Sequence, residues 1–207
     1  MNNAAGLSYV EISSPGSDDL APLILFHGSG RREDDLVDFA AAAAPARRVI
    51  ALRGGVSHDG GFAFFRRNPD RSLDQGEVGR AAIQLADFVR IVGRADGRAP
   101  VLVGYSNGAI AAAALLAAAP GECAGAVLMR PLSAFPGAIP ADLSGHSALL
   151  IAGAHDDRRA PGDVLLLEAQ LRAAGADVSA HVLDCGHGWD PAGGDVELTR
   201  SWLGRLG

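Results

Sequence analysis

A serine between two glycines is the feature of this sequence that most directly suggests chemistry. Gly104, Ser106 and Gly108 form the pattern G-x-S-x-G. Such a serine acts as a nucleophile when it lies on a sharp turn between a strand and a helix. The apolar residues 101–103 predict that strand, and the Ala-rich residues 107–119 predict that helix. The pattern is weak by itself, but in this context it makes Ser106 the candidate nucleophile.

A serine hydroxyl is a poor nucleophile near pH 7 and needs a neighbouring base. The chain has six histidines, and His187 lies just after residues 178–183, which are expected to form a strand. His187 also lies C-terminal to the candidate acids described below. The resulting chain order of serine, acid and histidine is one of the known orders for this type of catalytic site. His187 is therefore the candidate general base.

The base needs a carboxylate that orients it and stabilises its protonated form. Residues 148–152 predict a buried strand, and Asp156 and Asp157 follow its end. We favour Asp156, which lies three residues after Gly153, and keep Asp157 as the alternative.

Backbone N–H groups must stabilise the negative oxygen that forms when a serine attacks a carbonyl. One donor is expected from Asn107, the residue after the nucleophile. The second is expected from Ser29, in the glycine-rich loop that follows the apolar residues 23–26. His27 in the same loop is interpreted as a residue that shapes the loop, not as a base.

A long irregular segment, residues 53–74, is rich in Gly, Arg and Phe, and loops of this length in compact domains are usually functional. Arg53, Phe64 and Phe65 in this segment, together with Trp189 near His187, are candidates for lining a substrate pocket. The alternative for the phenylalanines is that they hold the loop against the body of the protein.

The elements that must position these residues alternate between buried strands and helices. This order predicts an α/β fold with a mostly parallel sheet covered on both faces, and the length of 207 residues suits a single domain over residues 1–207. In such sheets, ligands bind beyond the carboxyl ends of the strands. Strands are expected at residues 7–12, 23–26, 49–52, 101–103, 126–129, 148–152 and 178–183, and helices at 35–44, 75–92, 107–119, 161–174 and 196–206.

Together, the motifs around His27, Ser106, Asp156 and His187 resemble those of the phospholipase/carboxylesterase family of α/β-hydrolases. Within it, the segments 53–55 and 64–67 are similar to small bacterial carboxylesterases of the hydroquinone-responsive type. The resemblance implies a three-layer α/β-hydrolase fold, hydrolysis of small-molecule carboxylic esters without a cofactor, and possible homodimers. This chain departs from the family pattern after Asp156, where the family commonly has a proline and this chain has Asp157.

Charge and composition limit the partners, the location and the metal sites that we expect for this chain. The formal net charge of −6 argues against a nucleic-acid partner and against an anionic membrane surface. No apolar segment approaches the roughly 20 residues needed to span a bilayer, and the first residues lack the pattern of a signal peptide. The chain has only two cysteines and no pair of histidines four residues apart on a helix, so we expect a cytoplasmic protein and no metal site.

Two functional alternatives remain open from the sequence. An acyl thioesterase would use the same serine, histidine and aspartate, so the motifs do not separate it from an esterase. A non-catalytic binding protein on the same scaffold is the less favoured alternative, because fold alone does not fix function.

Overall fold

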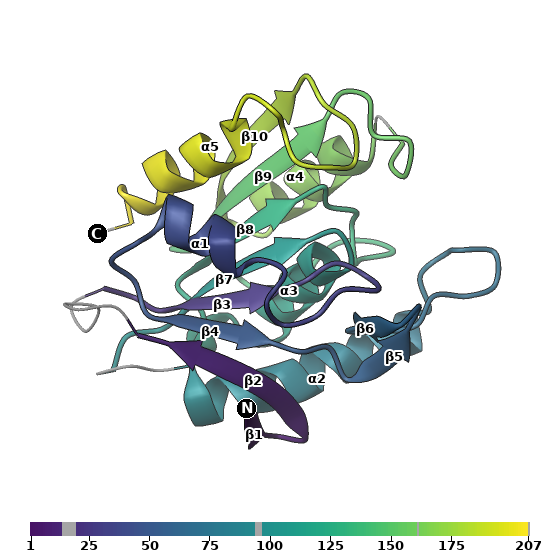
Figure 1. Cartoon of the computed structure of the whole chain (residues 1–207). Coiled ribbons are helices and arrows are strands. Elements are labelled where there is room, and N and C mark those ends of the chain that lie inside the picture. The colour runs from purple at the N-terminus through teal and green to yellow at the C-terminus, as the bar shows by residue number, and fades with distance from the viewer. Residues whose placement is uncertain (14–19, 94–96, 161, 207) are drawn as a thin grey trace.

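The computed structural model describes residues 1–13, 20–93, 97–160 and 162–206. Its centre is an eight-stranded sheet with the strand order β1-β2-β4-β3-β7-β8-β9-β10 (Figure 1). Six neighbouring strands, from β4 to β10, run parallel, and the edge strands β2 and β1 are antiparallel. The strands are β1 (Asn2–Ala4), β2 (Leu7–Ile12), β3 (Leu23–Phe26), β4 (Val49–Leu52), β7 (Val101–Tyr105), β8 (Gly125–Met129), β9 (Ser147–Gly153) and β10 (Asp177–Leu183).

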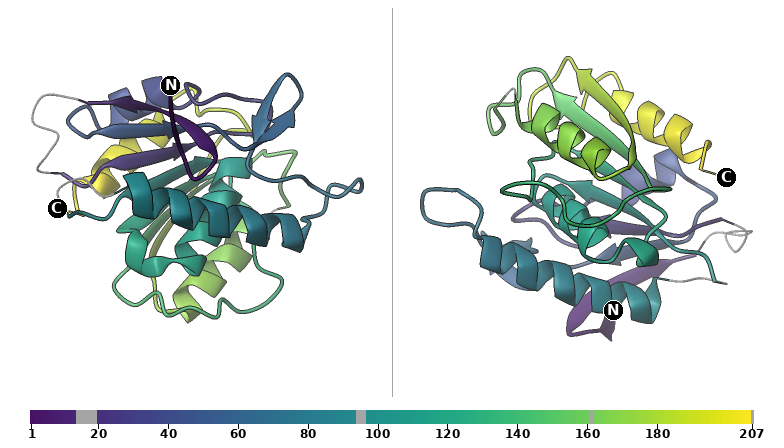
Figure 2. Two further views of the ribbon diagram at one scale, coloured as in Figure 1. Left: turned by 90° about the horizontal axis from the view of Figure 1, so that it is seen from below. Right: turned by 180° about the vertical axis from the view of Figure 1, so that it is seen from behind.

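Helices cover both faces of this sheet, which gives the three layers (Figure 2). The helices α2 (Gln75–Val92), α3 (Asn107–Ala118) and α4 (Asp163–Ala173) pack on one face, where their apolar side chains join one core cluster. The helices α1 (Val37–Ala43) and α5 (Gly194–Leu203) pack on the other face around a second cluster. The sequence-based prediction of a three-layer α/β fold is therefore confirmed.

The burial of the elements follows from their composition. The strands β3 and β4 consist of apolar residues that are all buried, as expected for parallel strands with helices on both faces. Helix α3 is rich in alanine and is buried on nearly all sides, which lets it pack closely against the sheet. Helix α2 instead buries one stripe, and the carboxylate of Asp74 caps its first turn by accepting a hydrogen bond from the Glu77 N–H at 3.0 Å.

The predicted bounds of β2, β3, β4 and α2 agree with the structure residue for residue. The long segment 53–74 is less irregular than predicted, because it contains a small antiparallel pair, β5 (Val56–His58) and β6 (Gly61–Ala63). The strand β1 and the 3₁₀ helix η2 (Pro120–Glu122) were not predicted, since both are only three residues long. Helix α4 begins at Asp163, and Pro161, where its start was expected, lies outside the described residues.

None of the helices in the described part of the chain combines the length and apolar character needed to cross a membrane.

Candidate active site

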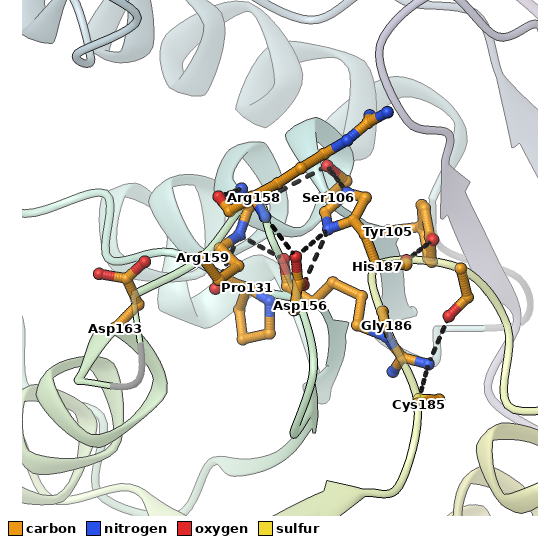
Figure 3. Close-up of polar contacts among 12 residues, drawn as sticks. Tyr105, Ser106, Pro131, Asp156, Arg158, Arg159, Asp163, Cys185, Gly186 and His187 are labelled. Atoms are coloured by element: carbon orange, nitrogen blue, oxygen red, sulfur yellow. Dashed lines mark hydrogen bonds and ion pairs between the residues drawn. The ribbon is translucent and has the colours of Figure 1, made fainter.

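Three sequence-predicted residues meet at the carboxyl edge of the sheet. Ser106 follows β7, Asp156 follows β9 and His187 follows β10. Because these strands are parallel and belong to one sheet, the loops after them lie at the same edge, although the residues are up to 81 positions apart in the chain. In the structure, the side chain of His187 contacts those of both Ser106 and Asp156 (Figure 3).

Ser106 lies on a sharp turn between β7 and α3. Its backbone has φ 54° and ψ −108°, a conformation that non-glycine residues rarely adopt, and its N–H donates to the Met129 carbonyl at 2.9 Å. The two glycines of the motif permit the turn. A Cβ atom on Gly104 would lie 2.5 Å from the carbonyl oxygen of Gly108. A Cβ atom on Gly108 would lie 2.0 Å from the carbonyl oxygen of Phe26. The motif therefore requires glycine at both positions for steric reasons.

The ring of His187 connects the other two side chains. Its Nε2 lies 2.9 Å from Ser106 Oγ, and its Nδ1 lies 2.9 and 2.8 Å from the two carboxylate oxygens of Asp156. The side chains of His187 and Asp156 are 11% and 3% exposed. Burial lowers the pKa of His187, and the hydrogen bond that its ring donates to the Asp156 carboxylate opposes that shift. The imidazole is thus kept neutral and oriented with one nitrogen toward the serine hydroxyl.

The two adjacent aspartates lie in different environments. Asp156 accepts from His187 and, at 2.9 Å, from the backbone N–H of Arg158, whereas Asp157 is exposed. The loop of Asp156 is joined to the loop of His187 by a hydrogen bond from the His155 N–H to the Cys185 carbonyl at 2.9 Å. The geometry therefore supports Asp156, and not Asp157, as the partner of His187.

The predicted oxyanion donors come from two elements, the start of α3 and the turn after β3. Asn107 is the first residue of α3, directly after Ser106, and its side chain is buried. Its Oδ1 accepts a hydrogen bond from the Phe64 N–H at 2.8 Å. Ser29 lies in an exposed turn after β3, and β3 is paired with β7 so that Phe26 is level with Gly104. His27 Nε2 accepts from the Gly54 N–H at 3.0 Å, a contact that shapes this loop.

The structure changes the interpretation of the predicted pocket residues. Phe64 and Phe65 are 6% and 2% exposed and belong to the hydrophobic core, which favours the alternative that they hold the long loop to the body. Their place in a pocket wall stays a prediction. Arg53 forms an ion pair with Glu33, with its Nε 2.6 Å from a carboxylate oxygen, and lies over the Phe62 ring. Trp189 is 44% exposed and stacks between the rings of Phe39 and Tyr105.

Two arginines of the site were not found by sequence reasoning. Arg159 donates from Nη2 to Ser106 Oγ at 3.2 Å. Arg130 is fully buried directly after β8 and donates to the carbonyls of Gly186 and Gly188, on both sides of His187. Both arginines follow the carboxyl ends of strands, and this position is the feature of the sequence that could have indicated a role in the site. The sequence contains many arginines, however, and nothing in it distinguished these two.

A cavity of about 300 Å³ opens beside Asp156 and Arg159. Its walls come mainly from the loops after β8 and β9 and from the start of α4. No group of three or more His, Cys, Asp or Glu side chains that could hold a metal ion occurs in the described ranges.

Comparison with known proteins shows that this chain is similar to hydrolases. No family model matches the chain. MhqD of Bacillus subtilis (strain 168), described as a candidate hydrolase, is 30% identical over 184 residues, which cover 87% of this chain and 90% of MhqD. A carboxylesterase of Bacillus cereus is 28% identical with a TM-score of 0.89, covering 97% of this chain and 95% of its own. A Mesorhizobium loti carboxylesterase is 29% identical with a TM-score of 0.86, covering 99% and 97%.

Proposed function

Because this chain belongs to the phospholipase/carboxylesterase-type α/β hydrolases, we propose that it hydrolyses carboxylic esters through Ser106, His187 and Asp156. The observation that carries this proposal is the unbroken hydrogen-bonded line from the Asp156 carboxylate through both nitrogens of His187 to Ser106 Oγ. A buried carboxylate, a neutral imidazole and a strained serine in this arrangement are the parts that acyl transfer needs.

In the proposed reaction, Ser106 Oγ attacks the ester carbonyl while its proton passes to His187 Nε2. The carbonyl oxygen becomes an oxyanion that accepts from the backbone N–H groups of Asn107 and Ser29. The C–O bond to the alcohol then breaks, and the proton on His187 goes to the leaving alcohol. Water, activated by the same imidazole, hydrolyses the acyl-enzyme and releases the carboxylic acid. Asp156 keeps Nδ1 protonated and stabilises the transient imidazolium throughout.

We propose small or short-chain esters as the substrates. The cavity of about 300 Å³ next to Asp156 lies at the lower end of the range for small-molecule sites. A thioesterase is the second candidate, because a thioester carbonyl would meet the same nucleophile and the same base.

A fluorophosphonate probe and a substrate panel test this function. We expect the probe to label the wild-type protein on Ser106 and to leave Ser106→Ala unlabelled. The p-nitrophenyl esters of acetate, butyrate and octanoate, together with the acyl thioesters of the same chain lengths, then separate an esterase from a thioesterase. Absence of labelling and of hydrolysis in the wild-type protein would instead favour a binding protein on this scaffold.

The location is proposed to be the cytoplasm. Cys123 and Cys185 are both buried thiols, and this supports a reducing compartment.

A further inference from the structure

Arg159 contacts the same oxygen atom as the proposed general base. Its Nη2 lies 3.2 Å from Ser106 Oγ, while His187 Nε2 lies 2.9 Å from it, and Figure 3 shows both contacts meeting at Ser106. The proposed reaction uses the imidazole but assigns no task to the guanidinium. The question is therefore which group the Arg159 cation binds during the reaction.

Backbone carbonyls fix the orientation of this guanidinium. Its Nε donates to the carbonyls of Arg130 and Pro131 at 2.9 and 3.1 Å, and its Nη1 donates to the Arg158 carbonyl at 2.9 Å. The terminal nitrogens Nη1 and Nη2 each carry two N–H groups. Each of these nitrogens has one acceptor among the described residues, so one N–H on each remains for a ligand.

The charge of Arg159 has no carboxylate at ion-pair distance in the part of the chain that the structure describes. Asp156 is occupied by His187 and the Arg158 N–H, and Asp163 accepts from the Ala160 N–H at 2.8 Å. Burial, followed by the nearby charge of Arg67, lowers the pKa of Arg159 to about 10. The guanidinium is therefore still charged at neutral pH, and a partly buried cation of this kind is stabilised by an anionic partner.

The cavity of about 300 Å³ provides the space for such a partner. Arg159 lines it together with apolar residues, Pro131, Val164 and Val182 among them, and with the acidic residues Asp156 and Asp163. Ser106 is not among the lining residues, and Arg159 connects the cavity to it through the contact with Ser106 Oγ. A guanidinium presents paired N–H groups that match the two oxygens of a carboxylate. A small acyl or alcohol group that ends in a carboxylate would fill the apolar space and meet the cation.

We propose that Arg159 binds a carboxylate on the substrate, so that the preferred substrates are short esters with a carboxylate a few bonds from the scissile bond. This inference rests on the proposed esterase function and narrows it to a substrate class. Half-esters of short dicarboxylic acids carry the carboxylate on the acyl side, and acylated hydroxy acids carry it on the alcohol side.

Two matched pairs of esters test the proposal. Monomethyl succinate is compared with methyl butyrate for the acyl side, and acetoxyacetate with ethyl acetate for the alcohol side, with hydrolysis followed in a pH-stat. For at least one pair, we expect the wild-type kcat/KM to favour the charged ester by about tenfold or more. The pair that shows this preference identifies the side on which the carboxylate is held.

The variant Arg159→Gln should reduce that preference by about tenfold or more, and Arg159→Lys, which keeps the charge but loses the planar fork, should give an intermediate value. Arg90→Gln is the control, because it also removes one positive charge, but from an exposed side chain on α2 that pairs with Asp87 away from the site. We expect this control to change the preference by less than about threefold.

Three results would overturn the proposal: no wild-type preference for the charged ester in either pair, a preference unaffected by Arg159→Gln, or an equal loss on both members of a pair. The last result would show that Arg159 acts on the reaction of any ester and not on a carboxylate of the substrate. If Arg159→Gln does not fold, competitive inhibition of the wild-type protein decides instead, with succinate expected to bind about tenfold more tightly than butyrate and equal binding counting against the proposal. These results differ from those expected if the proposed esterase function is wrong. In that case no ester would be hydrolysed, and the fluorophosphonate would not label Ser106.

Discussion

Arg130 and Asp195 form a two-point ion pair beneath the loop that carries His187. The Nη1–Oδ1 and Nη2–Oδ2 distances are 2.8 and 2.9 Å, and the two side chains are 0% and 2% exposed. The same guanidinium donates to the Gly188 carbonyl at 2.8 Å and to the Gly186 carbonyl at 3.3 Å. The ion pair thus ties the end of β8 and the start of α5 to the backbone on both sides of the proposed base.

The variant Asp195→Asn should therefore be strongly destabilised. It leaves a buried guanidinium without its counter-charge, which typically costs about 3–5 kcal/mol. Urea denaturation measures this difference in the free energy of unfolding. Glu197→Gln is the control on the same helix, because it breaks an exposed ion pair with Arg200 and should change that free energy by less than about 1 kcal/mol. Equal stability of the two variants would contradict a structural role for the buried pair.

Substitution of the two adjacent aspartates should separate their roles. Asp156→Asn removes the carboxylate that orients His187 and should lower kcat by about 10³–10⁴-fold. Asp157→Asn changes an exposed side chain and should lower kcat by less than about twofold. Steady-state kinetics on p-nitrophenyl acetate gives both numbers. A larger loss from Asp157→Asn than from Asp156→Asn would transfer the proposed role to Asp157.

The pH dependence of kcat/KM should follow the protonation of His187. Burial lowers its pKa from the ordinary value of 6.5, and only the neutral imidazole accepts the serine proton. The rate should therefore rise with pH and reach half its plateau below pH 6.5. The positive charge of Arg158 also lowers this pKa, so Arg158→Gln should move the midpoint to higher pH.

A pH profile on p-nitrophenyl acetate from about pH 4.5 to 8 measures this midpoint. Arg90→Gln serves as the control, since Arg90 lies on α2 and pairs with Asp87 away from the site. A midpoint above 6.5 in the wild-type protein, or a downward shift in Arg158→Gln, would show that His187 is not the titrating base or that its environment differs from this geometry.

The sequence was sufficient to predict the order of strands and helices and the residues at the ends of the strands. Continuous apolar runs of four residues, such as residues 23–26 and 49–52, are typical of buried strands, and the stripe along residues 75–92 is typical of a helix with one buried face. Once the strands are parallel, chain order alone brings Ser106, Asp156 and His187 to one edge.

The parts that were not predicted depend on contacts between segments distant in the chain. The sequence left two roles open for Phe64 and Phe65, because their burial depends on how the long loop folds back on the body. Likewise, Arg130 and Arg159 acquire their positions from carbonyls and carboxylates up to 65 residues away. Local periodicity carries no information about such pairings.

The close approach of α3 to β3 should make Gly108 intolerant of any side chain. A Cβ atom there would lie 2.0 Å from the Phe26 carbonyl oxygen, so Gly108→Ala must shift the helix that begins beside Ser106. We expect a loss of roughly 1–3 kcal/mol in the free energy of unfolding together with lower fluorophosphonate labelling. Gly79→Ala is the matched control, because Gly79 lies in the exposed face of α2 with no atom within 4 Å of an added Cβ. This control should gain about 0.5–1 kcal/mol, since alanine favours a helix over glycine. If both variants gained stability, the steric argument for glycine at position 108 would be wrong.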